Sequence, residues 1–346
     1  MNGRVERLRA LLEEPLLVSD PANVRYLSGL GSSNAALLVE EDRVRLFTDF
    51  RYAESARAIE GVEFVEAKRD LFQTLSELLS GRIGFEASSL TYERYARLHA
   101  GGIDAVARYG LVEGLRAVKD EGEIDTIRRA AQIASNAFQR FADEGDLVGE
   151  TEGDLAWRME RFLHDGHADS VSFAVHVASG PNSAKPHSRP GDRRVEPGEI
   201  LLVDAGCMVD GYCSDCTRTF ATGRLPEELM KAYEVCLDAQ LAALDAVRPG
   251  ASGPGVDAEA RDRIEAAGYG EFFGHGLGHG VGLLVHEDPR LAQESRHTLA
   301  AGNVVTVEPG IYIPGLGGIR IEDLVVVRDG EPEILTTFTK DLLTVD

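Results

Sequence analysis

The sequence predicts a two-domain protein of the mixed α/β (α+β) class. Its 346 residues are more than a single hydrophobic core usually serves, so we expect two cores. Strand patterns and helical patterns alternate in the first third of the chain, and apolar runs interrupted by glycine occur in the second half. Hydrophobic residues make up 43% and charged residues 27% of the chain, which is typical of a globular protein and excludes a disordered one.

The first domain is expected to be a small α/β domain over residues 1–115. Apolar stretches on either side of a turn at Glu41 and Asp42 predict two strands, and the sequence RIGFE predicts a further short buried strand. Segments with helical spacing lie between and after these strands. The strand segments are residues 36–49 and 82–86, and the helical segments are residues 51–60 and 91–100.

The second domain is expected over residues 116–346, and a long amphipathic helix predicted at residues 120–141 opens it. Asp120 and Glu123 have the spacing of a capping box, in which each side chain binds the backbone N–H of the other residue at the start of a helix. Residues 247–257, VRPGASGPGVD, are expected to form a loop because glycine and proline favour turns.

Charge and composition exclude several classes of partner. The net charge is −22, from 36 basic and 58 acidic residues, and no run of basic residues could follow a phosphate backbone, so neither nucleic acid nor an anionic membrane is expected as a partner. The chain has no run of 18 apolar residues and no signal-peptide pattern, so we expect no membrane span and no export. Four cysteines are too few for a disulfide scaffold, and the expected location is the cytoplasm.

Two aspartates in one predicted hairpin are expected to share a face of it. Two apolar runs are joined at Asp210-Gly211, a pair that favours a two-residue turn because both positions tolerate positive φ. With that turn, Asp204 faces Thr217, and Asp215 lies diagonally across from Asp204 with the two Cα atoms about 7–8 Å apart. Two carboxylates at that separation can hold a pair of cations about 3.5–4 Å apart.

Other interpretations of this segment have to be weighed. Aspartates near a hairpin are commonly turn formers or solvated residues, and Asp210 fits that description. Asp204 does not, because it follows the apolar run ILLV and an unpaired buried carboxylate is costly. Cys213 and Cys216 have C-x-x-C spacing, but no second such motif exists and the two side chains point to opposite faces of the predicted strand. We therefore expect them to be small buried residues.

Three histidines lie in the glycine-rich segment of residues 272–289. The glycines disfavour a helix, so His275 and His279 are not the helical pair of a zinc protease, which also needs glutamate where Gly276 stands. In an extended chain these two histidines lie on one face, so we expect one metal ligand and one neighbouring proton carrier. The third histidine of the segment is His286. Three other histidines lack such a setting and are expected to be structural: His164, His167 and His176.

Two glutamates lie in apolar strand patterns further along the chain. Glu308 ends an apolar run, and Glu322 lies in IRIEDLVVV. A loop centred near Gly315 would place them opposite one another, although Pro309 and Pro314 disturb regular pairing. Taken singly, such acids are more often edge or turn residues than ligands. Four acids with one histidine, however, form a hard, oxygen-rich set that suits Mn²⁺ or Co²⁺ and also accepts Zn²⁺.

The order and settings of these five residues resemble those of the M24-type metallopeptidases with the creatinase/methionine-aminopeptidase fold. Within that family the chain is similar to the Xaa-Pro aminopeptidases and prolidases. The five residues are Asp204, Asp215, His279, Glu308 and Glu322, in the settings VDAG, GYCSDCTRTF, GHGLGHGVGLLVHE, VEPGIY and GIRIED. The resemblance covers nearly the whole chain, because SGPNSAKPH at 179–187 and the N-terminal segments NVRYLSGLG and LFTDFRY also match.

The resemblance implies a pita-bread catalytic domain from about residue 116, a smaller creatinase-type N-terminal domain, and a homodimer. It also implies two divalent metal ions held by the five residues, with Mn²⁺ expected first and Co²⁺ or Zn²⁺ as alternatives. Glu308 matches the general base, and Arg320 matches an arginine that orients Glu322 or meets a substrate carboxylate. Three histidines match groups of the substrate pocket: His187, His275 and His286.

The expected activity is that of an Xaa-Pro aminopeptidase, which hydrolyses the bond between an N-terminal residue and a following proline. An Xaa-Pro dipeptidase (prolidase) is the alternative, because both enzymes cut before proline and differ in whether the pocket beyond proline is open. A non-catalytic peptide-binding module on the same fold is more remote, because such relatives have lost metal ligands that are all present here. Methionine aminopeptidases generally lack an N-terminal domain of this length, which favours the proline-specific branch.

Overall fold

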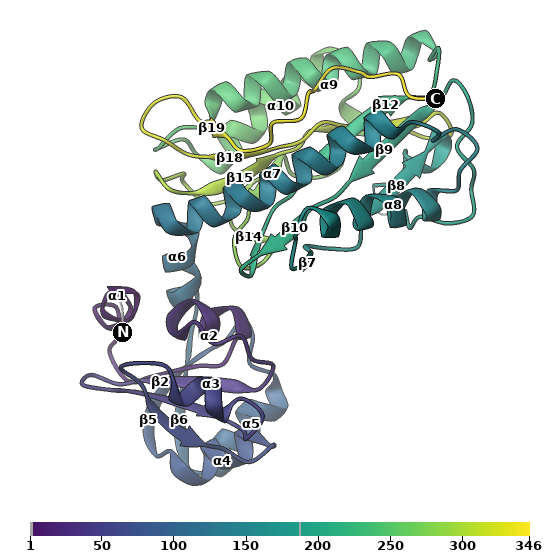
Figure 1. Ribbon diagram of the computed structural model, residues 1–346. Helices are drawn as coiled ribbons and strands as arrows, with labels where there is room; N and C mark the ends of the chain where they lie inside the picture. Colours follow the sequence, from purple (N-terminus) through teal and green to yellow (C-terminus); the bar gives the residue numbers. More distant parts are fainter. Residues whose placement is uncertain (1–2, 187) are drawn as a thin grey trace. The chain divides into compact units, whose positions relative to one another are not determined.

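The computed structural model describes residues 3–186 and 188–346. The chain divides into two compact units, residues 1–116 and residues 117–346, and each unit has a hydrophobic core of its own. Figure 1 traces the chain through both units. Within the described residues, no helix is long and apolar enough to cross a membrane.

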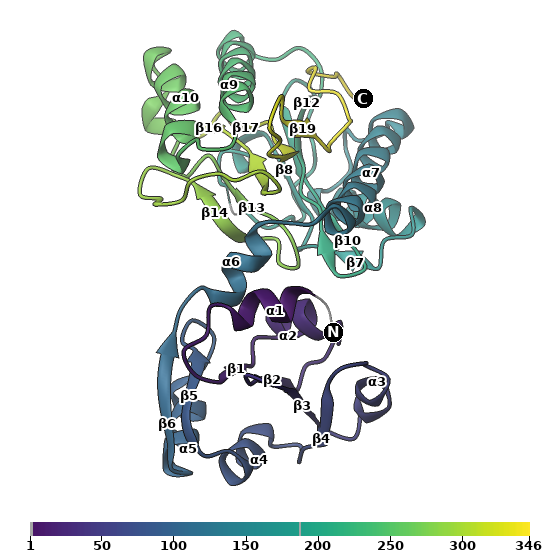
Figure 2. The same cartoon turned by 90° about the vertical axis from the view of Figure 1, so that its left-hand side faces the viewer.

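The unit of residues 1–116 is a six-stranded sheet with helices on both faces (Figures 1 and 2). The strand order is β4-β3-β2-β1-β5-β6, in which β1, β2 and β3 pair antiparallel and the remaining pairs are parallel. The strands are β1 (Leu16–Val18), β2 (Ala35–Val39), β3 (Val44–Thr48), β4 (Glu63–Glu66), β5 (Gly81–Glu86) and β6 (Ile103–Arg108). The helices are α1 (Gly3–Arg9), α2 (Pro21–Ser28), α3 (Ala53–Arg57), α4 (Leu71–Leu78) and α5 (Tyr92–Ala100), and α6 (Leu111–Ala117) spans the boundary.

Most elements predicted for this unit are confirmed. The two strands around Glu41 and Asp42 are β2 and β3, and the further predicted strand and the second predicted helix are β5 and α5. Thr91 caps α5 by accepting a hydrogen bond from a backbone N–H of the first turn. The helix predicted over residues 51–60 is wrong in length, because α3 is only five residues long and no side chain caps its first turn.

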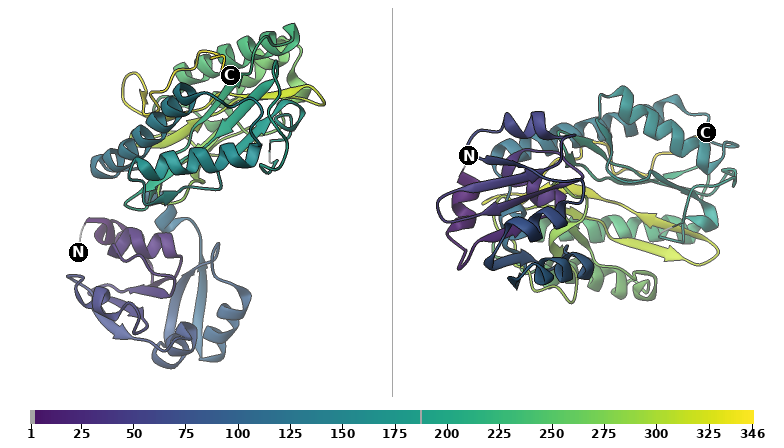
Figure 3. Two further views of the ribbon diagram at one scale, coloured as in Figure 1. Left: turned by 45° about the vertical axis from the view of Figure 1, so that its right-hand side comes forward. Right: turned by 90° about the horizontal axis from the view of Figure 1, so that it is seen from below.

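In the unit of residues 117–346, antiparallel sheets lie between two pairs of helices (Figures 2 and 3). Helices α7 and α8 cover one side, and α9 and α10 cover the other. The two larger sheets have the orders β12-β9-β8 and β14-β13-β15-β18-β19, and two smaller ones have the orders β11-β10-β7 and β16-β17. The helices are α7 (Glu121–Glu144), α8 (Glu152–Asp165), α9 (Glu227–Ala246) and α10 (Gly253–Ala266), with short 3₁₀ turns η1 (Gly180–Asn182) and η2 (Gly270–Phe272). The strands are β7 (Ser170–Val171), β8 (His176–Ser179), β9 (Ile200–Asp204), β10 (Cys207–Val209), β11 (Tyr212–Cys213), β12 (Thr217–Ala221), β13 (Gly278–Gly280), β14 (Glu287–Leu291), β15 (Val304–Val307), β16 (Gly310–Ile313), β17 (Gly317–Arg320), β18 (Asp323–Val326) and β19 (Glu333–Ile334).

Capping residues set the starts of two of these helices. The capping box of Asp120 and Glu123 is formed, so the long helix predicted there is confirmed as α7. The loop predicted over residues 247–257 is wrong in its second half, because α10 begins within it. Ser252 caps the first turn, and Pro254 lies inside that turn. Proline is tolerated there because backbone N–H groups of the first turn have no hydrogen-bond partner within the helix.

The hairpin predicted around Asp210 and Gly211 is confirmed, with φ of 48° and 79° at the two turn residues. Thr217 pairs with Asp204, which is the predicted register. The pairing is interrupted near Gly206, where an added Cβ would lie 2.0 Å from a carbonyl oxygen of the opposing segment. This close approach requires glycine and divides the hairpin into an inner pair, β10 and β11, and an outer pair, β9 and β12.

The second predicted pairing is also confirmed in register. Strands β16 and β17 form a hairpin whose turn includes Gly315, at a φ of 77°. Gly310 pairs with Arg320, and continuing this register by two residues places Glu308 opposite Glu322. The two prolines that could have disturbed the pairing stand on either side of β16 and do not interrupt it.

Candidate metal centre

A cavity of about 850 Å³ lies within the unit of residues 117–346 and gathers most of the residues predicted for the site. The five predicted ligands line it, together with three of the residues predicted to surround the metals. These residues are Asp204, Asp215, His279, Glu308 and Glu322, and His275, His286 and Arg320. His187, which was predicted to bind substrate, lies outside the described residues.

Strands and the short segments between them carry the predicted ligands. Asp204 is the last residue of β9, and His279 is the central residue of β13. The other three lie in short segments between strands, with Asp215 between β11 and β12, Glu308 between β15 and β16, and Glu322 between β17 and β18. Residues in or next to the sheet β12-β9-β8 and the sheet β14-β13-β15-β18-β19 therefore contribute to one cluster.

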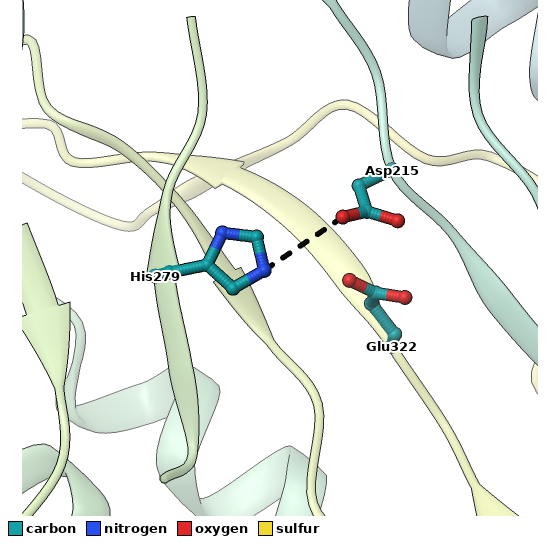
Figure 4. Close-up of side chains that lie close together, drawn as sticks. All are labelled: Asp215, His279 and Glu322. Atoms are coloured by element: carbon teal, nitrogen blue, oxygen red, sulfur yellow. Dashed lines mark ion pairs between the residues drawn. The ribbon is translucent and has the colours of Figure 1, made fainter. Parts of the chain in front are cut away.

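Asp215, His279 and Glu322 converge on a common point (Figure 4). Their ligating atoms all lie within 4.8 Å of one another, and the three side chains are buried. The Nε2 atom of His279 is 3.7 Å from Oδ2 of Asp215. Two carboxylates and one imidazole at this spacing are a donor set that a divalent cation can accept.

The acids of this cluster disfavour one another's charge. Burial raises the pKa of Asp215 well above its usual value, and the negative charges of Glu322 and Asp204 raise it further. Burial likewise raises the pKa of Glu322 well above its usual value, with added repulsion from Glu308 and Asp204. A cation among these carboxylates would remove the repulsion and favour their charged forms.

Two carboxylate oxygens of the predicted ligands have no hydrogen-bond partner among the described residues. They are Oδ1 of Asp204 and Oε1 of Glu322, and both atoms are buried. Buried polar atoms in folded proteins are almost always paired, so each exception calls for an unseen partner. The donor set and these two oxygens together fit divalent metal ions.

Glu308 and His279 are directly linked. His279 Nε2 lies 3.1 Å from Oε1 of Glu308, and the hydroxyl of Thr306 donates to the same oxygen at 3.0 Å. Burial alone would raise the pKa of Glu308, but the hydrogen bond and charge of His279, together with the charges of His275 and Arg320, outweigh it and lower this pKa to about 2. Glu308 is therefore a carboxylate that stays charged at neutral pH.

Arg320 orients Asp204 and does not contact Glu322 directly. Its Nη2 donates to Oδ2 of Asp204 at 2.5 Å, its Nε to the Thr217 hydroxyl at 3.0 Å, and its Nη1 to the Tyr312 hydroxyl at 3.0 Å. The Thr217 hydroxyl in turn donates to Oε2 of Glu322 at 2.7 Å. Three of the five N–H groups of Arg320 are therefore used within the protein.

A second buried arginine, Arg218, ties the C-terminal segment to the same site. Its guanidinium donates to the carboxylate of Asp323 at 2.9 Å and to the carbonyl oxygens of Phe338 at 2.7 Å and Thr339 at 2.8 Å. It also donates to the carbonyl oxygen of Glu322. The backbone of a predicted ligand is thus held through Arg218 by residues close to the end of the chain.

Among the cavity residues that were not predicted from the sequence are His176, Tyr312 and Arg290. His176 was expected to be structural, but it lines the cavity, and its Nε2 lies 2.9 Å from the Ser188 hydroxyl. Tyr312 bonds the ring of His275 at 3.0 Å, and Arg290 also lines the cavity. The sequence carried one signal for Arg290, since it closely follows His286, which was predicted to lie in the substrate pocket.

The cysteines take no part in the site. Cys213 packs in one hydrophobic cluster and Cys216 in another, and all four cysteines are buried free thiols. The prediction that Cys213 and Cys216 are small buried residues on opposite faces is confirmed.

Comparisons with known proteins agree with this geometry. Metallopeptidase family M24 matches residues 125–329, and the Creatinase/Prolidase N-terminal domain matches residues 4–118. An Xaa-Pro dipeptidase from Pyrococcus furiosus is 33% identical, covering 99% of this chain and 100% of that protein. The structure of an Xaa-Pro dipeptidase from Bacillus anthracis is 36% identical with a TM-score of 0.95, covering 99% of each chain. That of an X-Pro aminopeptidase from Thermotoga maritima is 34% identical with a TM-score of 0.89, covering 98% of this chain and 100% of the other.

The predicted fold class is therefore confirmed, with a creatinase-type N-terminal domain followed by a pita-bread catalytic domain. The M24 match covers more than half of the chain, and its residues include all five predicted ligands. The chain belongs to metallopeptidase family M24.

Proposed function

We propose that the protein is an Xaa-Pro dipeptidase, which hydrolyses the bond between a residue and a C-terminal proline. The observation that carries the proposal is Arg290, which lines the cavity and whose guanidinium makes no hydrogen bond within the described residues. A guanidinium pairs with a carboxylate through two parallel N–H donors. A dipeptide presents a free carboxylate directly after proline, and a longer peptide does not.

From the sequence, an Xaa-Pro aminopeptidase was the expected activity and a dipeptidase was the alternative. This proposal places the dipeptidase first. Two of the compared relatives bear the name Xaa-Pro dipeptidase, and one bears the name X-Pro aminopeptidase at similar identity. Similarity to these relatives therefore supports cleavage before proline. It does not decide between a dipeptide and a longer peptide as the substrate. Arg290 supports the dipeptide, because its guanidinium donates to no described residue, whereas Arg320, which also lines the cavity, uses three of its five N–H groups within the protein.

The proposed metal ligands are the five residues predicted from the sequence, and Mn²⁺ is the proposed metal. Bound divalent cations would polarise the scissile carbonyl and lower the pKa of the attacking water. Glu308, a carboxylate in reach of His279, is the proposed general base that passes a proton to the leaving proline nitrogen. The exposed ring of His286 lies 4.4 Å from that of His279 between centroids and is proposed to donate a hydrogen bond to the developing oxyanion.

The proposal is tested by offering Mn²⁺-loaded enzyme the dipeptide Ala-Pro and the tripeptide Ala-Pro-Ala under the same conditions. We expect a higher kcat/KM for the dipeptide. A higher kcat/KM for the tripeptide would reject the dipeptidase and restore the aminopeptidase.

The part played by Arg290 is tested separately. Arg290→Gln should raise the KM for Ala-Pro by about tenfold or more, since hydrogen bonds to charged groups contribute about 1.5–3 kcal/mol. Arg296→Gln is the matched control, because Arg296 is exposed and does not line the cavity. An unchanged KM in Arg290→Gln would remove the carboxylate-binding role.

The homodimer and the cytoplasmic location stay predictions.

A further inference from the structure

The glycine-rich segment that carries His275 and His279 is regular strand only from Gly278 to Gly280. The preceding residues, from Phe273 to Leu277, belong to no helix or strand. Backbone N–H and C=O groups that are buried need partners, and a segment without a neighbouring strand has to find them elsewhere. Glycine also leaves such a segment with more conformational freedom than other residues would.

Side chains of helix α10 supply these partners. Nη1 of Arg261 donates to the carbonyl oxygen of Phe273 at 3.0 Å, and Nη2 donates to that of His275 at 2.7 Å. Oδ1 of Asp257 accepts a hydrogen bond from the N–H of Leu277 at 3.0 Å. The bonded residues alternate along the segment, as they do along a strand paired with a neighbour. Two side chains therefore take the place of a strand edge.

The pair that makes these bonds is itself rigidly held. Asp257 and Arg261 lie one helical turn apart and form two parallel hydrogen bonds, of 2.7 and 2.9 Å. The Asp257 side chain is 0% exposed, and the Arg261 guanidinium lies 4.2 Å from the centroid of the Phe273 ring. A planar guanidinium held on one side leaves its remaining N–H groups fixed in direction, which a lysine ammonium could not reproduce.

The bonded segment leads directly to the site. The ring of His275 lines the cavity and bonds the Tyr312 hydroxyl at 3.0 Å, and His279 follows two residues after Leu277. On the opposite edge, the carbonyl oxygen of Leu277 accepts the N–H of Glu308 at 2.8 Å. Displacing Leu277 would therefore move a proposed ligand on either side of it.

We propose that Asp257 and Arg261 are positioning residues of the peptidase, which fix the backbone of residues 273–277 and through it His275, His279 and Glu308. Neither side chain lines the cavity, so the pair acts through the segment and not on the substrate. The assignment rests on the metallopeptidase site proposed above. It extends that site to a helix that contributes no ligand.

The test compares Arg261→Lys with Arg263→Gln in the full-length protein. Arg263 is the matched control, because it lies on the same helix in an exposed pair with Asp238, 3.7 Å apart. We expect Arg261→Lys to weaken Mn²⁺ binding by about tenfold in titration calorimetry, to lower kcat by about tenfold, and to speed amide hydrogen exchange in residues 273–279. Arg263→Gln should leave all three quantities within twofold of wild type.

A double-mutant cycle with His275→Ala separates positioning from general destabilisation. If Arg261 acts through His275, the loss of kcat caused by Arg261→Lys is smaller in the His275→Ala background than in wild type. A variant that melts at a lower temperature but keeps Mn²⁺ affinity and kcat within twofold of wild type would overturn the proposal.

Asp257→Asn is the second variant, to be measured if Arg261→Lys does not fold. It keeps an acceptor for Leu277 N–H and loses the charge that holds Arg261, so weaker Mn²⁺ binding supports the proposal and unchanged binding overturns it. Metal affinity and hydrogen exchange need no peptide substrate. A wild-type protein that cleaves no Xaa-Pro dipeptide would therefore reject the proposed function and leave this test in force.

Discussion

Asp215 is a buried carboxylate with other acids beside it, so its effect on stability depends on whether a cation is bound. Without a cation, burial and the charges of Glu322 and Asp204 oppose its ionisation. With a cation, the same carboxylates become partners of a positive charge. Removing the charge at this position should therefore stabilise the metal-free protein and destabilise the metal-bound protein.

We expect Asp215→Asn to raise the melting temperature of the metal-free protein and to lower that of the Mn²⁺-loaded protein, both relative to wild type. Thermal unfolding in EDTA and in Mn²⁺, with bound metal determined by elemental analysis, measures both effects. Asp210→Asn is the control, because Asp210 lies in the exposed hairpin turn. If Mn²⁺ raised the melting temperature of Asp215→Asn as much as that of wild type, the result would contradict the ligand assignment.

Glu86 is a second buried carboxylate, in the unit of residues 1–116. Burial raises its pKa to about 7 from a usual value of 4.5, and the charge of Glu113 adds to the shift. Hydrogen bonds from the backbone of Ser19 and Asp20 and from the Asn23 amide favour the charged form but do not outweigh burial. The folded protein therefore binds a proton more tightly at Glu86 than the unfolded chain does.

This difference predicts how stability depends on pH. A pKa raised by folding gives stability that is complete below pH 4.5 and is lost as pH rises through 7, by about 3 kcal/mol in total. Glu86→Gln cannot ionise, so its free energy of unfolding should lack this decline. Urea unfolding of both proteins at pH 5 and pH 8 measures it. A difference between variant and wild type that is the same at both pH values would disprove the assignment.

Whether a site residue could be predicted depended on how local its signal is. Asp204 and Asp215 could be placed on one face because a two-residue turn between them fixes the register. The position of His176 at the site could not be predicted, because it follows from the pairing of β8 with β9, which brings His176 opposite Asp204. No turn residue joins those two strands, so nothing in the sequence specified their register. Arg290 was missed because its closeness to His286 in the sequence does not reveal whether its side chain faces the cavity.

At the level of elements, close packing of strands at glycine positions shapes the site. Strand β13 lies so close to β15 that a Cβ added at Gly278 would be 2.0 Å from the carbonyl oxygen of Thr306. The hydroxyl of that threonine also accepts the N–H of His279 and donates to Glu308. Separating the two strands would therefore disturb both proposed ligands.

Gly278→Ala should lower the free energy of unfolding by about 1–3 kcal/mol, the usual range for overpacking, and should weaken Mn²⁺ binding. Gly274→Ala is the control in the same segment, since a Cβ there meets no atom within 4 Å. Urea unfolding and titration calorimetry measure the two effects. Equal stability of the two variants would show that the strands can move apart freely.

Elements defined by caps and turns were predicted best. The positive φ values of Asp210 and Gly211 and the capping box of Asp120 are local properties of a few adjacent residues, and both elements formed as predicted. The start of α10 was missed because Ser252 and Pro254 favour a helix start as well as a turn. Only the packing of α10 against its neighbours decides between the two, and that information is not local.

At the scale of the whole molecule, the two units have separate cores, and the candidate metal site belongs to one of them. Core residues of the first unit all lie before residue 117, and the cavity is lined only by residues of the second unit. Ligand binding stabilises the folded state that contains the site, by about 2.7 kcal/mol at a hundredfold excess over Kd. Metal should therefore stabilise the two units unequally.

We expect EDTA to speed amide hydrogen exchange throughout the core of residues 117–346 and to leave the core of residues 1–116 unchanged. Mn²⁺ should restore the slower exchange, and Mg²⁺ at equal concentration should restore less of it, because the set includes an imidazole ligand. Hydrogen-exchange mass spectrometry resolves peptides from each unit. Equal acceleration in both cores would mean that the units unfold together.

The contacts of Arg218 have a consequence for truncated forms of the chain. The segment that matches family M24, residues 125–329, contains every proposed ligand. A fragment that ends at residue 329 would lack the carbonyl groups of Phe338 and Thr339, which hold Arg218 against the backbone of Glu322. Such a fragment would keep the ligands and lose the contacts that fix one of them. A truncated catalytic domain made for expression therefore has to extend past Thr339.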